Sequence, residues 1–244
     1  MQLLLDLGNT LLKAALWEGS KLLTETSMDA EDTETLKQLT ESYGTPKLCF
    51  IATVREIPEK LHVFLSAFNV QQLSHNTNLP FGIAYRTPAT LGADRIAAVA
   101  AAWKRFPDTN VLVIDMGSCI TFDLLTADGI YQGGSISPGI RMRLKAMHAF
   151  TGRLPLLEPL PDTPMTGKTT SESMLSGAVN GTRFEMQQYI HQYYKIYEDL
   201  TVIVSGGDNK YFDYQFKNSI FAASNLVLEG LKVILDFNEN QKLE

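Results

Sequence analysis

A short sequence pattern occurs twice in this chain of 244 residues, once at the start and once near the middle. Leu4–Thr10 reads LLDLGNT and Val113–Cys119 reads VIDMGSC. Each copy is an apolar run followed by aspartate, one variable residue, glycine and a small polar residue. A second apolar stretch follows each copy, which predicts a strand, a tight turn and another strand in both places. Two such turns that face each other would hold a chain of phosphates between two half-molecules, because backbone N–H groups in such turns converge on anions.

Composition limits the class of protein and its partners. Hydrophobic residues make up 45% of the chain, which is ordinary for a globular protein and too high for a disordered one. Lys and Arg total 21 against 27 Asp and Glu, so the net charge is −6. This balance argues against a general affinity for nucleic acid or an anionic membrane, and we expect neither as a partner. A small anion can still bind where the local charge is positive.

The apolar runs and the two cysteines indicate a cytoplasmic protein. The longest purely apolar stretches, such as residues 96–103, are too short to span a bilayer. Met1 leads directly into a predicted strand rather than a targeting signal. Cys49 and Cys119 both lie in apolar, strand-like runs. We interpret them as small buried hydrophobes in a reducing compartment, not as a disulfide, catalytic or metal site.

The order of predicted elements repeats along the chain. Strands are predicted at 2–6, 11–17, 21–27, 47–53 and 70–73, with helices at 33–43 (N-cap Asp32), 58–68 and 91–106. After a polar break at 107–110, strands follow at 111–115, 120–126, 130–135 and 201–205, with helices at 171–197 and 222–237. The pattern predicts an α/β fold of two tandem domains, residues 1–108 and 109–244, whose first-strand loops border a shared cleft.

The first turn contains groups suited to phosphate and a hydrated cation. Gly8 permits a tight backbone turn close to a ligand. Asn9 and Thr10 add side-chain donors, and Lys13 adds positive charge. Asp6 is placed to hold Mg²⁺, which keeps several waters and takes one or two carboxylates. The alternative is a plain hairpin with a polar tip, because Asp-x-Gly is common in turns.

The second turn repeats this logic with Asp115, Gly117 and Ser118. Asp115 ends a run of four apolar residues, where packing alone gives no reason for a carboxylate. Two ordinary hairpins remain the alternative, but the presence of both motifs in one chain favours phosphate binding.

Two further motifs each leave two interpretations open. A buried strand ends at Ser205–Asp208 (SGGD). The paired glycines there allow a flat aromatic group such as adenine to lie against the backbone, or they make a simple tight turn. Asp94 stands at the start of the Ala-rich helix, where its spacing favours a capping carboxylate. The functional alternative is a general base beside Arg95, whose guanidinium would hold a substrate carboxylate.

Other common catalytic patterns are missing from the sequence. The four histidines have no metal-ligand spacing, and there is neither a Gly-x-Ser-x-Gly nucleophile elbow nor a Gly-x-x-x-x-Gly-Lys-[Ser/Thr] loop. A glycine-rich passage, residues 133–139, leads toward Arg141, Arg143 and Lys145. This passage either lines the cleft or precedes a basic helix face.

The motifs occur in a set order along nearly the whole chain: DLGNT at 6–10, LGADR at 91–95, DMGS at 115–118, GGSISPG at 133–139, GKTT at 167–170, SGGD at 205–208 and NLVLEGL at 225–231. Together they strongly resemble the type III pantothenate kinase family, which belongs to the superfamily of acetate and sugar kinases, heat-shock chaperones and actin. The resemblance implies an α/β fold of two tandem ribonuclease H-like (actin-like ATPase) domains with a nucleotide cleft between them.

The resemblance also implies an activity: ATP-dependent phosphorylation of the terminal hydroxyl of pantothenate to 4′-phosphopantothenate, the first step of coenzyme A synthesis, in a homodimer. Asp94 would be the catalytic base. ATP would contact Asp6, Leu7, Gly8, Asn9, Thr10, Leu11, Leu12, Lys13 and Ser118. Pantothenate would contact Tyr85, Gly92, Ala93, Asp94, Arg95 and, across the dimer, Thr170. Mg²⁺ would accompany ATP, held through water by Asp6, and Asp115 would hold a monovalent cation, potassium or ammonium.

The chain departs from the family at one place, where Ser118-Cys119 replaces the usual Thr-Ala. Serine keeps the hydroxyl for the nucleotide, whereas cysteine changes local packing and thiol sensitivity. The alternative functions are a kinase for another small hydroxylated acid or sugar, and a non-catalytic ATP-binding accessory or regulatory protein. An accessory protein would lack the base or the acceptor contacts. The presence of Asp94, Arg95, Tyr85 and Thr170 therefore favours catalysis.

Overall fold

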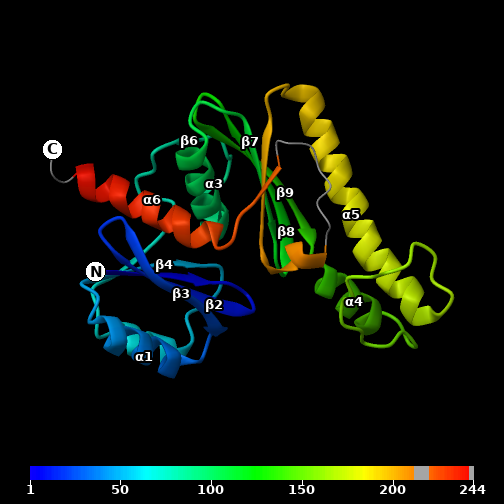
Figure 1. The fold of residues 1–244 in the computed structure, drawn as a ribbon, viewed down its shortest axis with the longest axis horizontal. Coiled ribbons are helices and arrows are strands. Elements are labelled where there is room, and N and C mark those ends of the chain that lie inside the picture. Colours follow the sequence, from blue (N-terminus) through cyan, green and yellow to red (C-terminus); the bar gives the residue numbers. More distant parts are fainter. Residues whose placement is uncertain (212–219, 242–244) are drawn as a thin grey trace. The chain divides into compact units, whose positions relative to one another are not determined.

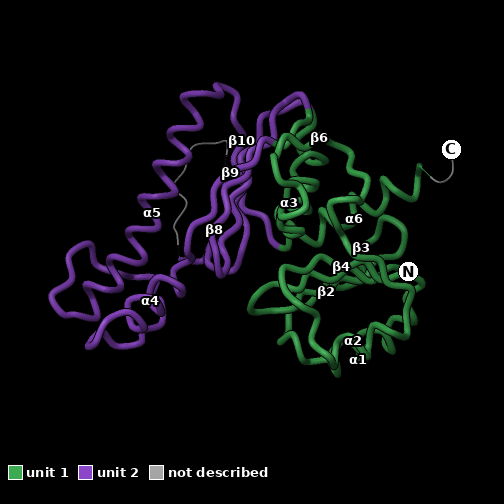
Figure 2. The backbone as a smooth tube through the Cα atoms, turned by 180° about the vertical axis from the view of Figure 1, so that it is seen from behind, with its two compact units in different colours: residues 1–107, 129–131, 225–244 green, residues 108–128, 132–224 purple. Residues whose placement is uncertain are grey.

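The structure, a computed structural model, describes residues 1–211 and 220–241 (Figure 1). They form two compact units (Figure 2). Unit 1 comprises residues 1–107, 129–131 and 225–244, and unit 2 comprises residues 108–128 and 132–224. Among the described residues, no helix has the length and apolar character needed to span a bilayer.

The sheet of unit 1 is built around strand β1 (Gln2–Leu7), which is buried over almost its whole length. The strand order is β3-β2-β1-β4-β5, with β2 at Leu11–Glu18, β3 at Lys21–Asp29, β4 at Leu48–Thr53 and β5 at Val70–Gln72. β1 pairs antiparallel with β2 and parallel with β4. The predicted strands of the first half are confirmed.

Helices cover both faces of this sheet. On one face, α1 (Thr33–Tyr43) and α2 (Glu59–Leu65) enclose a core with alternate residues of β1, whose members include Leu3, Leu5, Leu7, Leu36, Leu61 and Leu65. On the other, α6 (Leu226–Gln241) places Lys232 5.7 Å from the centroid of the Trp17 ring. Figure 1 shows α1 and α6 on opposite sides of the strands. α6 also packs closely on α3 (Ala93–Arg105).

Local chemistry sets the helix starts of unit 1. The carboxylate of Asp32 accepts the backbone N–H of Thr35 at 3.1 Å, so the predicted N-cap of α1 is confirmed. The hydrogen bonds from Thr35 lower the pKa of Asp32 below its usual value. A short 3₁₀ helix, η1 (Pro88–Thr90), precedes α3, whose N-cap is Gly92. The predicted start of that helix at residue 91 is therefore two residues early.

The predicted final helix at 222–237 is wrong at its start. Ala222 belongs to strand β11 (Ile220–Ala222), where it pairs with Val204 of β10 (Thr201–Ser205). The backbone of Asn225 then takes a left-handed conformation (φ 52°), and the helix begins at Leu226. The resulting helix belongs to unit 1, although residues 132–224 before it belong to unit 2. The domain boundary after residue 108 stays a prediction.

The second sheet repeats the local topology of the first. Its order is β11-β10-β7-β8-β9-β6, with β7 at Val111–Met116, β8 at Cys119–Thr126, β9 at Ile130–Pro138 and β6 at Gly82–Ile83. β7 pairs antiparallel with β8 and parallel with β10, just as β1 pairs with β2 and β4. The duplication seen in the sequence is therefore also a duplication of strand pairing.

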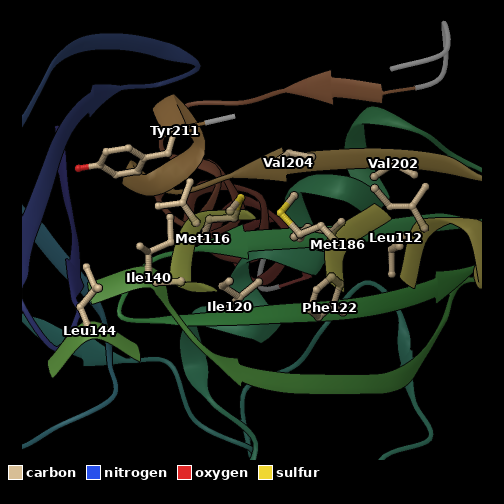
Figure 3. Packing of buried hydrophobic residues seen from close by; sticks show 14 of the residues in the cluster. Leu112, Met116, Ile120, Phe122, Ile140, Leu144, Met186, Val202, Val204 and Tyr211 are labelled. Carbon is tan, nitrogen blue, oxygen red and sulfur yellow. The ribbon is translucent and has the colours of Figure 1, made fainter. Parts of the chain in front are cut away.

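One face of this sheet forms the core of unit 2 with α4 (Ile140–Ala149) and α5 (Thr170–Ile196). Figure 3 shows Met116, Phe122 and Val204 from the strands beside Ile140 from α4 and Met186 from α5. The predicted long helix at 171–197 is confirmed. Burial of this apolar face is the main stabilising contribution, because the hydrophobic effect scales with the area removed from water.

The two cysteines differ in environment. Cys49 is fully buried in β4, and burial raises the pKa of its thiol to about 12, so the interpretation as a small hydrophobe is confirmed. Cys119 begins β8 beside the second turn and is only partly buried. The prediction of a buried thiol is wrong there, because the strand end lies at the turn rather than in the core.

We predict that Gly230→Ala destabilises the protein, because an added Cβ would lie 1.6 Å from the carbonyl oxygen of Ala97 in α3. The helices must separate, which costs about 1–3 kcal/mol or more, and the melting temperature should fall. The matched control is Gly177→Ala in α5, where nothing lies within 4 Å of the added atom. That change should be neutral or stabilising, and equal melting temperatures for the two variants would contradict the prediction.

Candidate active site

The first turn joins β1 to β2 through residues 8–10. The N–H of Gly8 donates to the carbonyl oxygen of Leu11 at 3.1 Å, and an added Cβ on Gly8 would lie 3.4 Å from that oxygen. Asn9 and Thr10 are exposed at its tip. The turn is therefore tight, and it presents two polar side chains to solvent.

Asp6 and Lys13 lie on the same face of the sheet beside this turn. They are opposite each other in the β1–β2 register, and directly opposed residues share a face. Asp6 is only 8% exposed and Lys13 is partly buried. The neighbouring Leu7 and Leu12 belong to the apolar core on the opposite face. Because their side chains are buried in the core, Leu7 and Leu12 leave only their backbone for contact with a nucleotide. The side chain of Leu11, in contrast, is exposed.

Arg55 is a basic residue at the first turn that the sequence analysis did not single out. β4 runs parallel to β1, and just beyond it the N–H of Val54 donates to the carbonyl of Leu7 at 3.3 Å. The guanidinium of Arg55 then reaches the carbonyl oxygen of Asn9 at 3.5 Å. The available signal was a basic residue directly after a buried strand, since parallel strands end at the same sheet edge.

The predicted acceptor residues of unit 1 are brought together at the start of α3. Asp94 lies in the first turn of the helix, and its Oδ1 accepts the N–H of Arg95 at 2.8 Å. The N-cap is Gly92, so Asp94 is a first-turn carboxylate and not the capping residue. An added Cβ on Gly92 would lie 2.4 Å from Oδ1 of Asp94. The carboxylate therefore occupies part of the space that a side chain at position 92 would need.

Arg95 and Tyr85 form the other part of this group. Arg95 is only 5% exposed, and its guanidinium carbon lies 5.8 Å from the centroid of the Tyr85 ring. Tyr85 in turn stacks on Tyr131, with ring centroids 6.3 Å apart. The guanidinium thus packs against an aromatic ring that is itself stacked on a second one.

The second turn, in unit 2, lies where three strands meet. Asp115 near the end of β7 is opposite Thr121 of β8 and Ser205 of β10. The N–H of Gly117 donates to the carbonyl of Cys119 at 2.9 Å, which closes the turn at Ser118. The two turns therefore share a sequence pattern, but the closing hydrogen bond reaches the third residue along from Gly8 and only the second residue along from Gly117.

Two glycines pack other segments against the second turn. Gly206 has φ 96°, and an added Cβ there would lie 2.2 Å from the carbonyl oxygen of Met116. Gly139 donates its N–H to the carbonyl of Ser118 at 3.0 Å, and its added Cβ would lie 2.3 Å from the carbonyl of Gly117. The end of β10 and the start of α4 thus both touch the turn. The glycine-rich passage at 133–139 ends against it.

Thr170 is the exposed first residue of α5. Thr169 caps this helix by accepting the N–H of Glu172 at 3.2 Å, and the Glu172 carboxylate accepts the N–H of Lys168 at 2.7 Å. Glu172 thus accepts the N–H of the residue before the N-cap rather than that of Thr169, and the two bonds together fix the chain direction next to Thr170.

The carboxylates of Asp6 and Asp115 fit a metal ion that binds together with a nucleotide. Within residues 1–211 and 220–241, no three His, Cys, Asp or Glu side chains gather to form a protein-only metal cluster. Asp6 and Asp115 each provide one carboxylate beside a turn. A single carboxylate with waters and phosphate oxygens is the usual setting for Mg²⁺.

Comparison with solved structures defines the class. A Baf family protein from Campylobacter jejuni superposes with a TM-score of 0.61 at 22% identity, covering 98% of this chain and 99% of that chain. The activator of the 2-hydroxyisocaproyl-CoA dehydratase from Clostridium difficile, with bound ADPNP, gives a TM-score of 0.55 at 12% identity, covering 100% of this chain and 97% of that chain. The chain has the actin-like ATPase and sugar kinase fold, in agreement with the predicted pair of ribonuclease H-like domains.

Sequence comparison identifies the family within this class. A model described as type III pantothenate kinase matches residues 2–192. Proteins named type III pantothenate kinase from Christiangramia forsetii and Phocaeicola vulgatus are 42% and 40% identical to this chain. The alignments cover 99% and 98% of this chain and 100% and 99% of those proteins. The chain belongs to the type III pantothenate kinase family, a family of phosphotransferases with an alcohol acceptor. The predicted family is confirmed, and so is the predicted activity: ATP-dependent phosphorylation of pantothenate, the first step of coenzyme A biosynthesis.

Proposed function

We propose that this chain phosphorylates the terminal hydroxyl of pantothenate with Asp94 as the general base. The hydroxyl oxygen forms a bond to the γ-phosphorus of ATP, the bond from that phosphorus to the bridging oxygen breaks, and ADP leaves. The hydroxyl proton goes to the Asp94 carboxylate. The observation that supports this role best is the carboxylate set into the space that Gly92 leaves, beside Arg95 and Tyr85.

Binding of the acceptor follows from its chemistry. Pantothenate carries a carboxylate at the end opposite to its reacting hydroxyl. The Arg95 guanidinium, held over Tyr85, supplies a charge-assisted partner for that carboxylate. Gly92, Ala93 and Tyr85 complete the acceptor contacts in unit 1, and Thr170 adds a hydroxyl at the start of α5 from a second copy of the chain.

Binding of ATP uses the two turns. The backbone N–H groups of the first turn, with Asn9, Thr10 and Lys13, contact phosphate oxygens, and Ser118 contacts the nucleotide from the second turn. ATP with a divalent metal is the family's phosphoryl donor. Mg²⁺ near Asp6 and a potassium or ammonium ion at Asp115 neutralise phosphate charge when bound. Positioning and charge neutralisation dominate phosphoryl transfer, because its transition state is loose.

We predict that Asp94→Asn retains ATP binding and loses most turnover. An amide cannot accept the proton, and general-base catalysis contributes about 10²–10⁴-fold. The measurement is ATP consumption with pantothenate present or absent, coupled to ADP detection, with ATP affinity determined by calorimetry. Unchanged turnover in the variant would reject the assignment of the base. Lack of pantothenate-dependent turnover in the parent, with or without potassium, would favour the accessory function.

A second prediction concerns the monovalent cation. Asp115→Asn removes the negative charge and should raise the potassium concentration for half-maximal activation by about tenfold, equivalent to about 1.4 kcal/mol. The control is Asp128→Asn, an exposed carboxylate at the far end of β8 whose Oδ1 accepts the Thr126 hydroxyl. Identical potassium titrations for parent, variant and control would count against a cation at Asp115.

We also propose that two copies of the chain associate through unit 2. Large apolar side chains are exposed over residues 136–184, namely Ile136 (62%), Phe150 (88%), Leu156, Leu160, Met165 (64%) and Phe184. Exposed apolar area of this kind favours an interface.

The dimer is tested by light scattering after size-exclusion chromatography. The parent should give twice the chain mass, and the double variant Phe150→Glu, Met165→Glu should shift the mass toward one chain. Val63→Glu is the control, because Val63 is 62% exposed on α2 of unit 1. A single-chain mass for the parent at micromolar concentration would overturn the proposal.

We further infer a cytoplasmic location without nucleic-acid or membrane partners. The net charge of −6 supports the absence of these partners.

A further inference from the structure

Arg141, in the first turn of α4, joins three segments of unit 2. Its guanidinium contacts Oδ1 of Asp208 at 3.2 Å, Oε2 of Glu158 at 3.1 Å and the hydroxyl of Tyr211 at 3.3 Å. Asp208 and Tyr211 belong to the short 3₁₀ helix η2 (Gly207–Tyr211), which directly follows Gly206. The side chain therefore ties α4 to the segment after β10.

Asp208 needs this partner because it is buried. It is only 6% exposed, and burial raises the pKa of its carboxyl, while Arg141 and Lys210 act in the opposite direction. A buried carboxylate without a positive partner is costly, so the ion pair fixes where η2 can lie. Tyr211 adds an apolar attachment, since its ring lies in the core with Met116 and Ile140 (Figure 3).

The start of α4 and the segment after β10 both pack against the second turn. Gly139, two residues before Arg141, packs on Gly117 and Ser118, and Gly206, two residues before Asp208, packs on Met116. The start of α4 and the start of η2 therefore both pack against the second turn, and the ion pair between Arg141 and Asp208 links them to each other. Loss of the pair would release the Gly206–Gly207 segment that packs beside the second turn.

We propose that Arg141 is a positioning residue for the nucleoside part of ATP, acting through Asp208 on the backbone of Gly206 and Gly207. The proposal rests on the proposed function, in that unit 2 binds ATP at the second turn. The nucleoside is the part affected, because an apolar, flat base needs a held backbone surface, whereas the phosphates are bound by the turns themselves.

The test compares ATP affinity in Arg141→Met with that in Lys145→Met. Lys145 is exposed on the same helix, so its loss removes the same charge without touching η2. Calorimetry without pantothenate should show the Kd for ATP raised about tenfold in Arg141→Met and unchanged in Lys145→Met. The Kd for inorganic triphosphate, bound through phosphate alone, should change less than twofold. Because no acceptor is present, this result does not depend on whether pantothenate is the substrate.

Two further variants keep the test decisive if Arg141→Met does not fold. Asp208→Asn keeps the shape and removes the buried charge, and it should raise the Kd for ATP with little change in melting temperature. Arg141→Lys keeps one charge without the planar fork, and it should give an intermediate Kd. In steady-state assays of these two variants, the Michaelis constant for ATP should rise. Their kcat and their Michaelis constant for pantothenate should stay within twofold of the parent values. Equal ATP affinity in parent, Asp208→Asn and Arg141→Lys would overturn the proposal, as would equal losses for ATP and triphosphate.

Discussion

The site depends on one repeated interaction, an antiparallel pair of strands joined by a short turn, with an aspartate one residue before the end of the first strand, on the face opposite the core cluster. In unit 1 this pairing sets Asp6 opposite Lys13, and in unit 2 it sets Asp115 opposite Thr121. Backbone N–H groups in turns of this kind can converge on an anion. A change of register by one residue would move each aspartate to the sheet face that forms the apolar core of its own unit.

Several buried charged groups have a partner or a packing surface that another element supplies. Arg95 lies over Tyr85, Asp208 contacts Arg141, and Lys232 lies over Trp17 with Asp236 as its ion-pair partner. Each arrangement costs desolvation that a purely apolar core would avoid. Arg95 is at the start of α3 and Asp208 follows the end of β10, whereas Lys232 contacts Trp17 at the end of β2 that is far from the first turn.

Glycine marks the places where backbones must touch. Gly206 and Gly139 lie on the second turn, and Gly92 leaves room for the Asp94 carboxylate. These contacts explain why the motifs at 115–118, 133–139 and 205–208, which look like separate turn signals in the sequence, lie together in unit 2. The Ser118-Cys119 departure from the family falls at this turn, where the partly exposed thiol begins β8. Neither the strand pairing nor the hydroxyl of Ser118 is altered by it.

Hydrophobic periodicity and turn chemistry are local properties, so the sequence predicted the strands, the two turns, the Asp32 cap and the order of motifs that identifies the family. Contacts between distant segments depend on which strands lie parallel and which helix covers which face. For that reason the sequence did not show Arg55 beside Asn9, the ion pair of Arg141 with Asp208, or Ala222 in a strand. The same reason explains α6, whose Gly230 packs on Ala97 far from its neighbours in the chain. The residues of a helix determine where it forms, but the element against which it packs depends on which apolar surface of the fold is left uncovered.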